Sequence, residues 1–311
     1  MRVLLPVIGT GMLLLLAADV FFTVFSPHGR GGPVNRRQTR ALWAIFRATG
    51  RRRDGSARER WLSLAAPLMV VSTLAVWVLW LVLGFALVYY PWIESFLVSP
   101  GTLRAPWVGA LYYSGYTAAT LGLGDVVARS EALRLLTVVE AFGGFALLSI
   151  SVTYFLAIYR ELVAMQSLAS DISGLFSEGE EHVLEFTRQE GYEALARWCE
   201  QLSGGLSRIL LAHFQYPVLH YFRPRKRSRA LPVQLGSLLT LRGRIGKDSG
   251  SEVLSTFSGH PSYLALTVAV DSYLDDVDQL FVPGRARADP VDPTALAERE
   301  HARLMSYMLY T

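Results

Sequence analysis

The stretch LYYSGYTAATLGLGD, residues 111–125, decides how this chain is interpreted. It lies between two long apolar segments, yet it holds three glycines, three tyrosines, three Ser/Thr residues and a final aspartate. Three structures fit such an interruption: a soluble catalytic loop, a plain hairpin between two membrane spans, or a segment that enters the membrane and returns. The flanking sequence distinguishes among them.

Three apolar segments in the first half are long enough to cross a hydrocarbon core, which takes about 20 helical residues. They are residues 3–25, 62–91 and 133–159. A cleaved signal peptide is the alternative for the first segment, but cleavage would export an arginine-rich loop, which membrane topology disfavours. With 51% hydrophobic residues, the 311-residue chain is too apolar for an ordinary soluble enzyme.

The loop at residues 27–61 carries ten arginines against Asp54 and Glu59. Beside apolar spans, such a loop is expected to stay in the cytoplasm rather than to bind nucleic acid. The N-terminus and residues 111–125 then lie outside, and the C-terminal half is cytoplasmic. Residues 36–50 fit an amphipathic helix on anionic lipid or, alternatively, a solvated connector. We expect a multi-pass protein of a prokaryotic plasma membrane.

The polar stretch is predicted to re-enter the membrane. Pro106 is placed to open a helix over residues 106–119, which is too short to span a bilayer. Gly122 and Gly124 then allow successive carbonyls to turn the same way, which side chains would obstruct. Non-helical backbone at membrane depth is tolerated where it is buried in protein or lines water. This order favours a re-entrant segment over a plain hairpin.

These residues resemble the pore domain of the potassium channel family. The family's filter, Thr-Val-Gly-Tyr-Gly-Asp, corresponds here to Thr120-Leu121-Gly122-Leu123-Gly124-Asp125, and residues 110–120 resemble its pore helix. Arg134 falls where bacterial members commonly open the inner helix, and Gly143-Gly144 falls at the family's hinge. The resemblance covers roughly residues 62–159 and leaves out the first helix and the C-terminal half.

The resemblance implies the roles of the filter residues. Backbone carbonyls of Thr120, Leu121, Gly122 and Leu123, with the Thr120 hydroxyl, would replace the hydration shell of K⁺, the transported ion. Gly124 completes the filter, and Asp125 would support it by accepting a hydrogen bond from Tyr113 or Tyr116. A closed ring of carbonyls needs four copies of this chain, so the implied partner is the chain itself in a homotetramer. No cofactor is expected.

Two further features concern selectivity and gating. Leu123 replaces the usual tyrosine and removes a hydrogen bond behind the filter, so a weakly selective cation channel is the alternative. Gly143 and Gly144 are expected to form a hinge or a site of close helix packing. By the resemblance, an apolar gate would line the cavity and inner mouth; its residues are Phe145, Leu148, Val152 and Leu156.

The C-terminal half is predicted to be a small helical domain. Residues 180–188, 191–216, 261–281 and 293–310 show helical apolar spacing. His213 and His220 suggest core packing rather than a metal or pH-sensing site, because Pro217 separates them. The single cysteine, Cys199, excludes an internal disulfide within one chain.

The sequence thus predicts an all-α membrane protein with three transmembrane helices, a re-entrant pore helix and filter between the second and third, and an all-helical cytoplasmic domain. The expected parts are an accessory helix (1–26), an Arg-rich linker (27–61), a pore domain (62–160) and the helical domain (161–311). Within the pore domain we expect an outer helix at 62–91, a pore helix at 106–119, the filter at 120–125 and an inner helix at 132–160. A non-conducting receptor or scaffold is the alternative from another class. Enzyme activity is not indicated, because no nucleophile–base pair or paired carboxylates occur at plausible positions.

Overall fold

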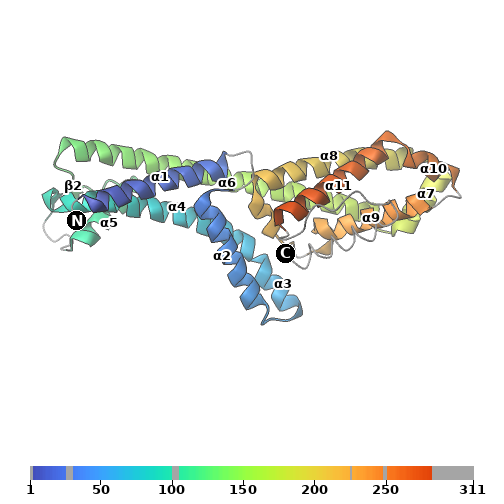
Figure 1. Cartoon of the computed structure of the whole chain (residues 1–311), viewed down its shortest axis with the longest axis horizontal. Coiled ribbons are helices and arrows are strands. Elements are labelled where there is room, and N and C mark those ends of the chain that lie inside the picture. The colour runs from blue at the N-terminus through green and yellow to red at the C-terminus, as the bar shows by residue number, and fades with distance from the viewer. Residues whose placement is uncertain (1–2, 26–30, 100–104, 225, 248–250, 282–311) are drawn as a thin grey trace. The chain divides into compact units, whose positions relative to one another are not determined.

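The computed structural model describes residues 3–25, 31–99, 105–224, 226–247 and 251–281. The chain divides into two units (Figure 1). The first unit comprises Met1–Thr49 and Ala65–Ile158, and the second comprises Gly50–Leu64 and Tyr159–Thr311. Both units are built almost wholly from helices, which confirms the predicted fold class.

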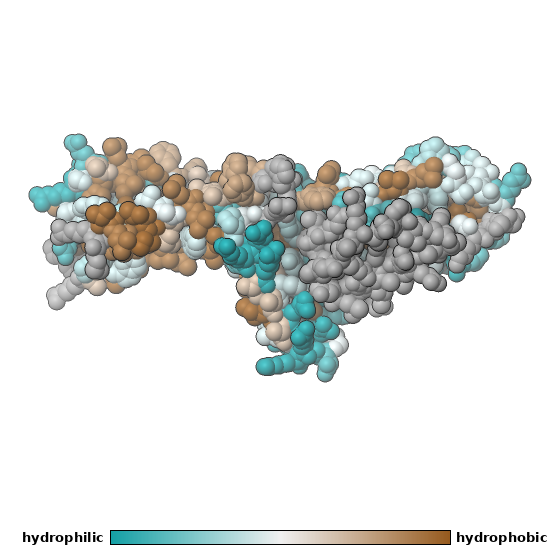
Figure 2. Space-filling model, viewed as in Figure 1, coloured by the Kyte–Doolittle hydropathy of each residue, from teal (hydrophilic) through white to brown (hydrophobic). Residues whose placement is uncertain are grey.

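The long apolar segments form helices α1 (Leu4–Val24), α4 (Ala65–Tyr89) and α6 (Glu131–Leu175). Within the described residues, the helical segments that contain them are long and apolar enough to span a membrane. Hydrophobic side chains cover much of the visible face around α1 and α4 (Figure 2). The chain is therefore a membrane protein, as the sequence predicts.

Two helix boundaries of the pore domain differ from the expected ones by three residues or more. Leu62 lies in α3 (Gly55–Ser63), so the outer helix begins later than residue 62. The inner helix does not end at residue 160, because α6 continues to Leu175 without a break. Residues 161–173 contain no glycine or proline, and buried Leu162, Met165, Leu168, Ala169 and Ile172 continue the helical spacing.

Helix α1 packs along α4 in the first unit (Figure 1). Gly9 and Gly84 bring the two helices together, since a Cβ on Gly84 would lie 2.7 Å from Leu13 Cδ2. Small residues at such crossings let membrane helices approach closely enough for van der Waals packing. The accessory helix is thus a packed part of the unit that holds the polar stretch.

Asp19 inside α1 is buried and fully partnered. Its Oδ2 accepts a hydrogen bond from Trp77 Nε1 on α4 at 2.9 Å. Its Oδ1 accepts hydrogen bonds from the backbone N–H groups of Val34 (2.7 Å) and Asn35 (3.1 Å). The carboxylate therefore caps the first turn of helix α2 (Pro33–Gly50), where free N–H groups and the positive end of the helix dipole favour an anion.

The arginine-rich linker is mostly helical. Helix α2 covers the whole segment expected to be amphipathic, and α3 follows it. Hydrophilic residues gather over these two helices in Figure 2. Between them, the Arg53 guanidinium lies 3.8 Å from the centre of the Trp61 ring, a cation–π contact.

The second unit is a helical domain. The expected helices correspond to α7 (Glu180–Glu190), α8 (Glu193–Gln215) and α11 (Pro261–Phe281), while residues 293–310 lie outside the described part. Helices α9 (Leu231–Lys247) and α10 (Glu252–Ser258) complete it with the short turns η2 (Pro217–Tyr221) and η3 (Arg227–Arg229). Ser251 caps α10 by accepting the Leu254 N–H.

The two histidines lie in the core of this domain, as predicted. His213 is 1% exposed, its Nδ1 lies 2.9 Å from the Ile209 carbonyl oxygen, and its ring meets Tyr273 edge to face. His220 packs against Tyr221 in η2, and α8 ends before Pro217. Burial lowers the pKa of His213 below its ordinary value and the pKa of His220 well below it.

We therefore expect the second unit to lose stability as pH falls below about 6.5, the ordinary histidine pKa. Below that pH the unfolded chain binds protons at both histidines, whereas the folded protein keeps them buried and neutral. The free energy of unfolding therefore falls by about 1.4 kcal/mol per pH unit for each histidine. Thermal unfolding of the detergent-solubilised protein between pH 8 and pH 5 measures this. His213→Gln should flatten the dependence, and His182→Gln, which replaces an exposed histidine, should not. An unchanged slope in His213→Gln would contradict the assignment.

Candidate functional site

The short helix before the glycines is α5 (Pro106–Ala118). Proline at its first position has no N–H to leave unpaired and has the φ angle that a helix requires. Its 13 residues are too few to span a bilayer. Tyr113, Ser114 and Thr117 are buried on the side that faces the rest of the unit. The predicted half-helix is thus present, and it ends one residue before the expected boundary.

The strand that follows α5 has an alternating backbone. Thr120, Gly122 and Gly124 have φ angles of 57°, 58° and 76°, whereas Leu121 and Leu123 between them do not have positive φ. Thr120 is the only non-glycine residue with positive φ in the described part of the chain. Such a conformation strains a residue with a Cβ and marks functional sites.

The alternation determines where the carbonyl groups can point. In an ordinary strand successive carbonyl groups point to opposite sides. When every second residue instead has a positive φ, successive carbonyl groups turn toward the same side. Hydrogen bonds from Thr120 N to Thr117 O and from Leu121 N to Tyr116 O, both 2.9 Å, tie the start of the strand to α5. Residues 120–124 are all exposed in the single chain.

Asp125 accepts a hydrogen bond from a tyrosine other than the two that were predicted. Tyr112 OH donates to Asp125 Oδ2 at 2.8 Å, so the prediction of Tyr113 or Tyr116 as the donor was wrong. Tyr116 OH instead donates to the carbonyl of Val126, and Tyr113 OH forms a 2.6 Å hydrogen bond with Thr137 Oγ1 on α6. Positions 112 and 116 share a helix face directed at the returning strand, while 113 is rotated toward the inner helix.

The outer end of the strand is fixed by three further contacts. Val126–Val127 (β2) pairs antiparallel with Leu97–Val98 (β1), and Ser99 N donates to Asp125 O at 2.8 Å. The Arg134 side chain donates from Nε to the Ala128 carbonyl at 3.0 Å. The glycine-containing segment is thus anchored at both ends.

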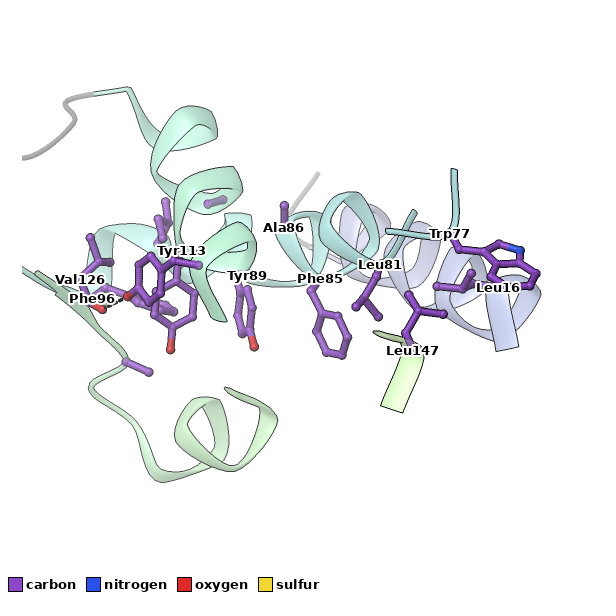
Figure 3. Close-up of a cluster of buried hydrophobic side chains, with 14 of the residues drawn as sticks. Leu16, Trp77, Leu81, Phe85, Ala86, Tyr89, Phe96, Tyr113, Val126 and Leu147 are labelled. Atoms are coloured by element: carbon purple, nitrogen blue, oxygen red, sulfur yellow. Dashed lines mark hydrogen bonds between the residues drawn. The ribbon is translucent and has the colours of Figure 1, made fainter. Parts of the chain in front are cut away.

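An aromatic cluster supports α5 from behind. The Tyr113 ring lies 5.0 Å from Tyr89 and 4.9 Å from Phe96, edge to face in both cases. In Figure 3 these rings begin a row of buried side chains that continues through Phe85 to Trp77. Edge-to-face rings fix their mutual orientation, so the cluster gives the polar stretch a stiff base.

Replacing Tyr112 with phenylalanine should loosen the outer end of the strand while the ring remains in place. The lost hydrogen bond has a carboxylate oxygen as its acceptor, and hydrogen bonds to carboxylates are among the stronger ones. We expect a lower thermal midpoint of the purified protein, because the strand loses one of its hydrogen bonds to α5. Tyr90→Phe is the control, since Tyr90 lies outside the polar stretch. An equal response of both variants would contradict the role of Tyr112.

Glu140 on α6 contacts α5. Ser114 Oγ lies within hydrogen-bond distance of both Glu140 Oε1 and the Val82 carbonyl oxygen. The side chain of Glu140 is fully buried. This contact joins the inner helix, the half-helix and α4 behind the strand, away from its exposed side.

The glycine pair on α6 is a contact point. A Cβ on Gly144 would come closer than 3.0 Å to the backbone of Ala118 at the end of α5, whereas one on Gly143 would meet only Leu81 Cδ1 at 4.0 Å. The close-packing alternative thus applies to Gly144. Helix α6 passes through the pair unbroken, so a hinge there stays a prediction.

The four residues expected to form an apolar gate share one exposed face of α6. Their side chains fall within an arc of about 80° at 100° per residue. Each is more than half exposed in the single chain; they are Phe145 (62%), Leu148 (63%), Val152 (51%) and Leu156 (58%). An apolar face of this kind requires lipid or protein to cover part of it.

Comparison with known proteins agrees with this geometry. Residues 75–161 match a protein-family model described as "Ion channel", which covers α5, the strand and most of α4 and the inner helix up to residue 161. The match confirms the resemblance to the ion-channel family over this part of the chain and supports an ion channel rather than an enzyme.

One curated relative is the uncharacterized membrane protein YdjJ of Bacillus subtilis (strain 168). It is 27% identical over 214 residues, which cover 68% of this chain and 61% of the relative. The alignment thus spans less than two thirds of that protein. No solved structure matches the chain.

Proposed function

We propose that the protein is a homotetrameric channel that conducts K⁺ passively and selectively through residues 120–124. The observation that carries the proposal is the alternating backbone of this strand directly after α5. Carbonyl oxygens of Thr120, Leu121, Gly122 and Leu123, with the Thr120 hydroxyl, would replace the water around the dehydrated ion. No side-chain charge is required for this.

The tetramer is proposed because one chain supplies one strand. A closed ring of carbonyl oxygens needs several copies around an axis, and fourfold symmetry gives the ring the size of the family's filter. Leu121 and Leu123 are 64% and 54% exposed in the single chain. Neighbouring copies would cover these apolar side chains, and the ring would enclose backbone that lipid cannot solvate.

The inner cavity and gate are proposed for the exposed face of α6. In a tetramer this face would line the path below the filter, where Phe145, Leu148, Val152 and Leu156 form successive apolar rings. Such rings stop ions when they narrow enough to exclude water. The C-terminal end of α5 would direct the negative end of its dipole toward the same cavity and favour a cation there.

The proposed location is a prokaryotic plasma membrane, with the N-terminus outside and the second unit in the cytoplasm. The arginines of α2 and α3 carry this assignment, because loops rich in arginine are retained on the cytoplasmic side. The strand 120–124 then opens toward the outside, and α6 leads into the cytoplasmic domain.

A weakly selective cation channel is the second candidate function, because Leu123 replaces the family's tyrosine. Leucine has no hydroxyl that could form a hydrogen bond behind the filter. The side chains that surround the filter and fix the diameter of the carbonyl ring would therefore make one hydrogen bond fewer per chain. Tyr112 and Tyr116 of the chain's own α5 donate hydrogen bonds to Asp125 and Val126, and these two bonds would hold the strand in place of that contact.

Rubidium flux into proteoliposomes tests the proposal, with the number of chains per particle measured by mass photometry. We expect four chains and a K⁺-dependent uptake that Na⁺ does not support. Equal uptake of Na⁺ would select the weakly selective channel. A verified tetramer without flux at any tested pH or lipid composition would favour the receptor or scaffold.

A further inference from the structure

Helix α2 presents an unpaired cationic face. It contains four arginines and no acidic residue. Arg36, Arg37 and Arg40 are exposed and lie within an arc of about 100° on the helix. Within the described ranges of the chain, none of the three has an ion-pair partner. The charge of this face is therefore available to an external anion.

The first turn of α2 is fixed to both neighbouring apolar helices. Besides the two hydrogen bonds to Asp19, Gly32 N donates to Thr23 Oγ1 on α1 at 2.9 Å. From α4, Thr73 Oγ1 donates to Asn35 Oδ1 at 3.0 Å, and Ser72 Oγ accepts from Gln38 Nε2 at 2.8 Å. These contacts come from the last two turns of α1 and from the N-terminal half of α4, so α2 begins on the side of the apolar spans that adjoins the linker.

Trp77 joins this anchored turn to the inner helix. Its indole N–H binds Asp19, and its ring centre lies 6.0 Å from that of Tyr154 on α6. Both rings are buried. Tyr154 lies between Val152 and Leu156 in sequence and faces away from them around the helix. Three contacts in series therefore connect α2 to the inner helix at the level of the proposed gate: from the α2 N–H groups to Asp19, from Asp19 to Trp77, and from Trp77 to Tyr154.

We propose that the face formed by Arg36, Arg37 and Arg40 binds the headgroups of anionic phospholipids, and that the Asp19–Trp77–Tyr154 contacts transmit this binding to the inner helix. The coupling rests on the proposed channel function, whereas the binding does not. The occupant is lipid because the helix starts at the membrane boundary and carries only positive charge. The half-exposed Ile45 on another side of α2 adds apolar surface suited to the same boundary.

The number of lipid molecules that the protein retains tests the site independently of ion flux. Native mass spectrometry of the full-length protein, solubilised with phosphatidylglycerol and phosphatidylcholine, should show retained phosphatidylglycerol. The triple variant Arg36→Gln, Arg37→Gln, Arg40→Gln should lose most of it. Arg197→Gln, an exposed arginine of α8, is the control and should retain it. Equal retention in the triple variant and the wild type would overturn the site.

Rubidium flux tests the coupling. Flux through the wild type should change several-fold between vesicles of phosphatidylcholine alone and vesicles with added phosphatidylglycerol. Trp77→Phe keeps an aromatic ring, although a smaller one, and removes the indole N–H that binds Asp19, so it should retain lipid and lose the response. Inorganic phosphate added to neutral vesicles should not reproduce the response. A full response in Trp77→Phe would overturn the coupling, whereas absence of wild-type flux in every lipid would refute the channel function and leave the lipid count decisive for the site.

Discussion

Alanine at Gly144 should abolish flux and destabilise the pore unit. The added Cβ would come closer than 3.0 Å to the carbonyl oxygen of Ala118, a backbone atom at the end of α5. Because a backbone atom cannot rotate away, α5 or α6 must shift, and the strand hydrogen-bonded to α5 must shift with it. Overpacking of this kind costs about 1–3 kcal/mol per chain.

The neighbouring glycine provides the matched control. A Cβ on Gly143 would be 4.0 Å from Leu81 Cδ1, which is ordinary van der Waals contact, so Gly143→Ala should fold and conduct. Thermal unfolding in detergent and rubidium uptake measure both variants. Normal uptake by Gly144→Ala, or equal loss in both variants, would contradict the packing of the inner helix against the end of the pore helix.

Alanine at Gly122 should abolish flux while the helices remain folded. The position has a φ of 58° and no neighbouring atom within 4 Å of a new Cβ, so the effect comes from the backbone alone. A residue with a Cβ disfavours this conformation by about 1–2 kcal/mol, which favours a flipped peptide group over the inward carbonyl.

The readouts for Gly122→Ala are rubidium uptake and circular dichroism. Gly11→Ala is its control, because Gly11 lies in α1 with open space around it and without positive φ. We expect helical content to be unchanged in both variants and uptake to be lost only at Gly122. Wild-type uptake by Gly122→Ala would mean that the carbonyls of this strand do not line the ion path.

The half-helix and the strand could be predicted from the sequence because local residues determine them. Pro106 starts the helix, and Gly122 and Gly124 adopt a backbone that few other residues can. The donor to Asp125 could not be chosen the same way. Three tyrosines lie in one short helix, and its rotation against the returning strand decides which of them faces Asp125. The shared face of Tyr112 and Tyr116 was the signal available.

The end of the inner helix and the partners of Asp19 could not be predicted from the local sequence. Composition changes near residue 160 from apolar to mixed, and that change suggested a domain boundary, although nothing there interrupts the helix. Asp19 has its partners on Trp77 and on the first turn of α2, which lie in separate parts of the sequence. Tertiary packing, which no local pattern encodes, brings those groups together.

In the proposed channel, carbonyl oxygens of residues 120–123 replace water around K⁺. The reversal potential of the purified protein in a planar bilayer, with K⁺ on one side and an equal concentration of Na⁺ on the other, tests it most directly. We expect a potential far from zero in the direction set by K⁺, and loss of the current in Gly122→Ala. A reversal potential near zero would contradict K⁺ selectivity, and a selective current that survives Gly122→Ala would contradict this role of the carbonyl oxygens.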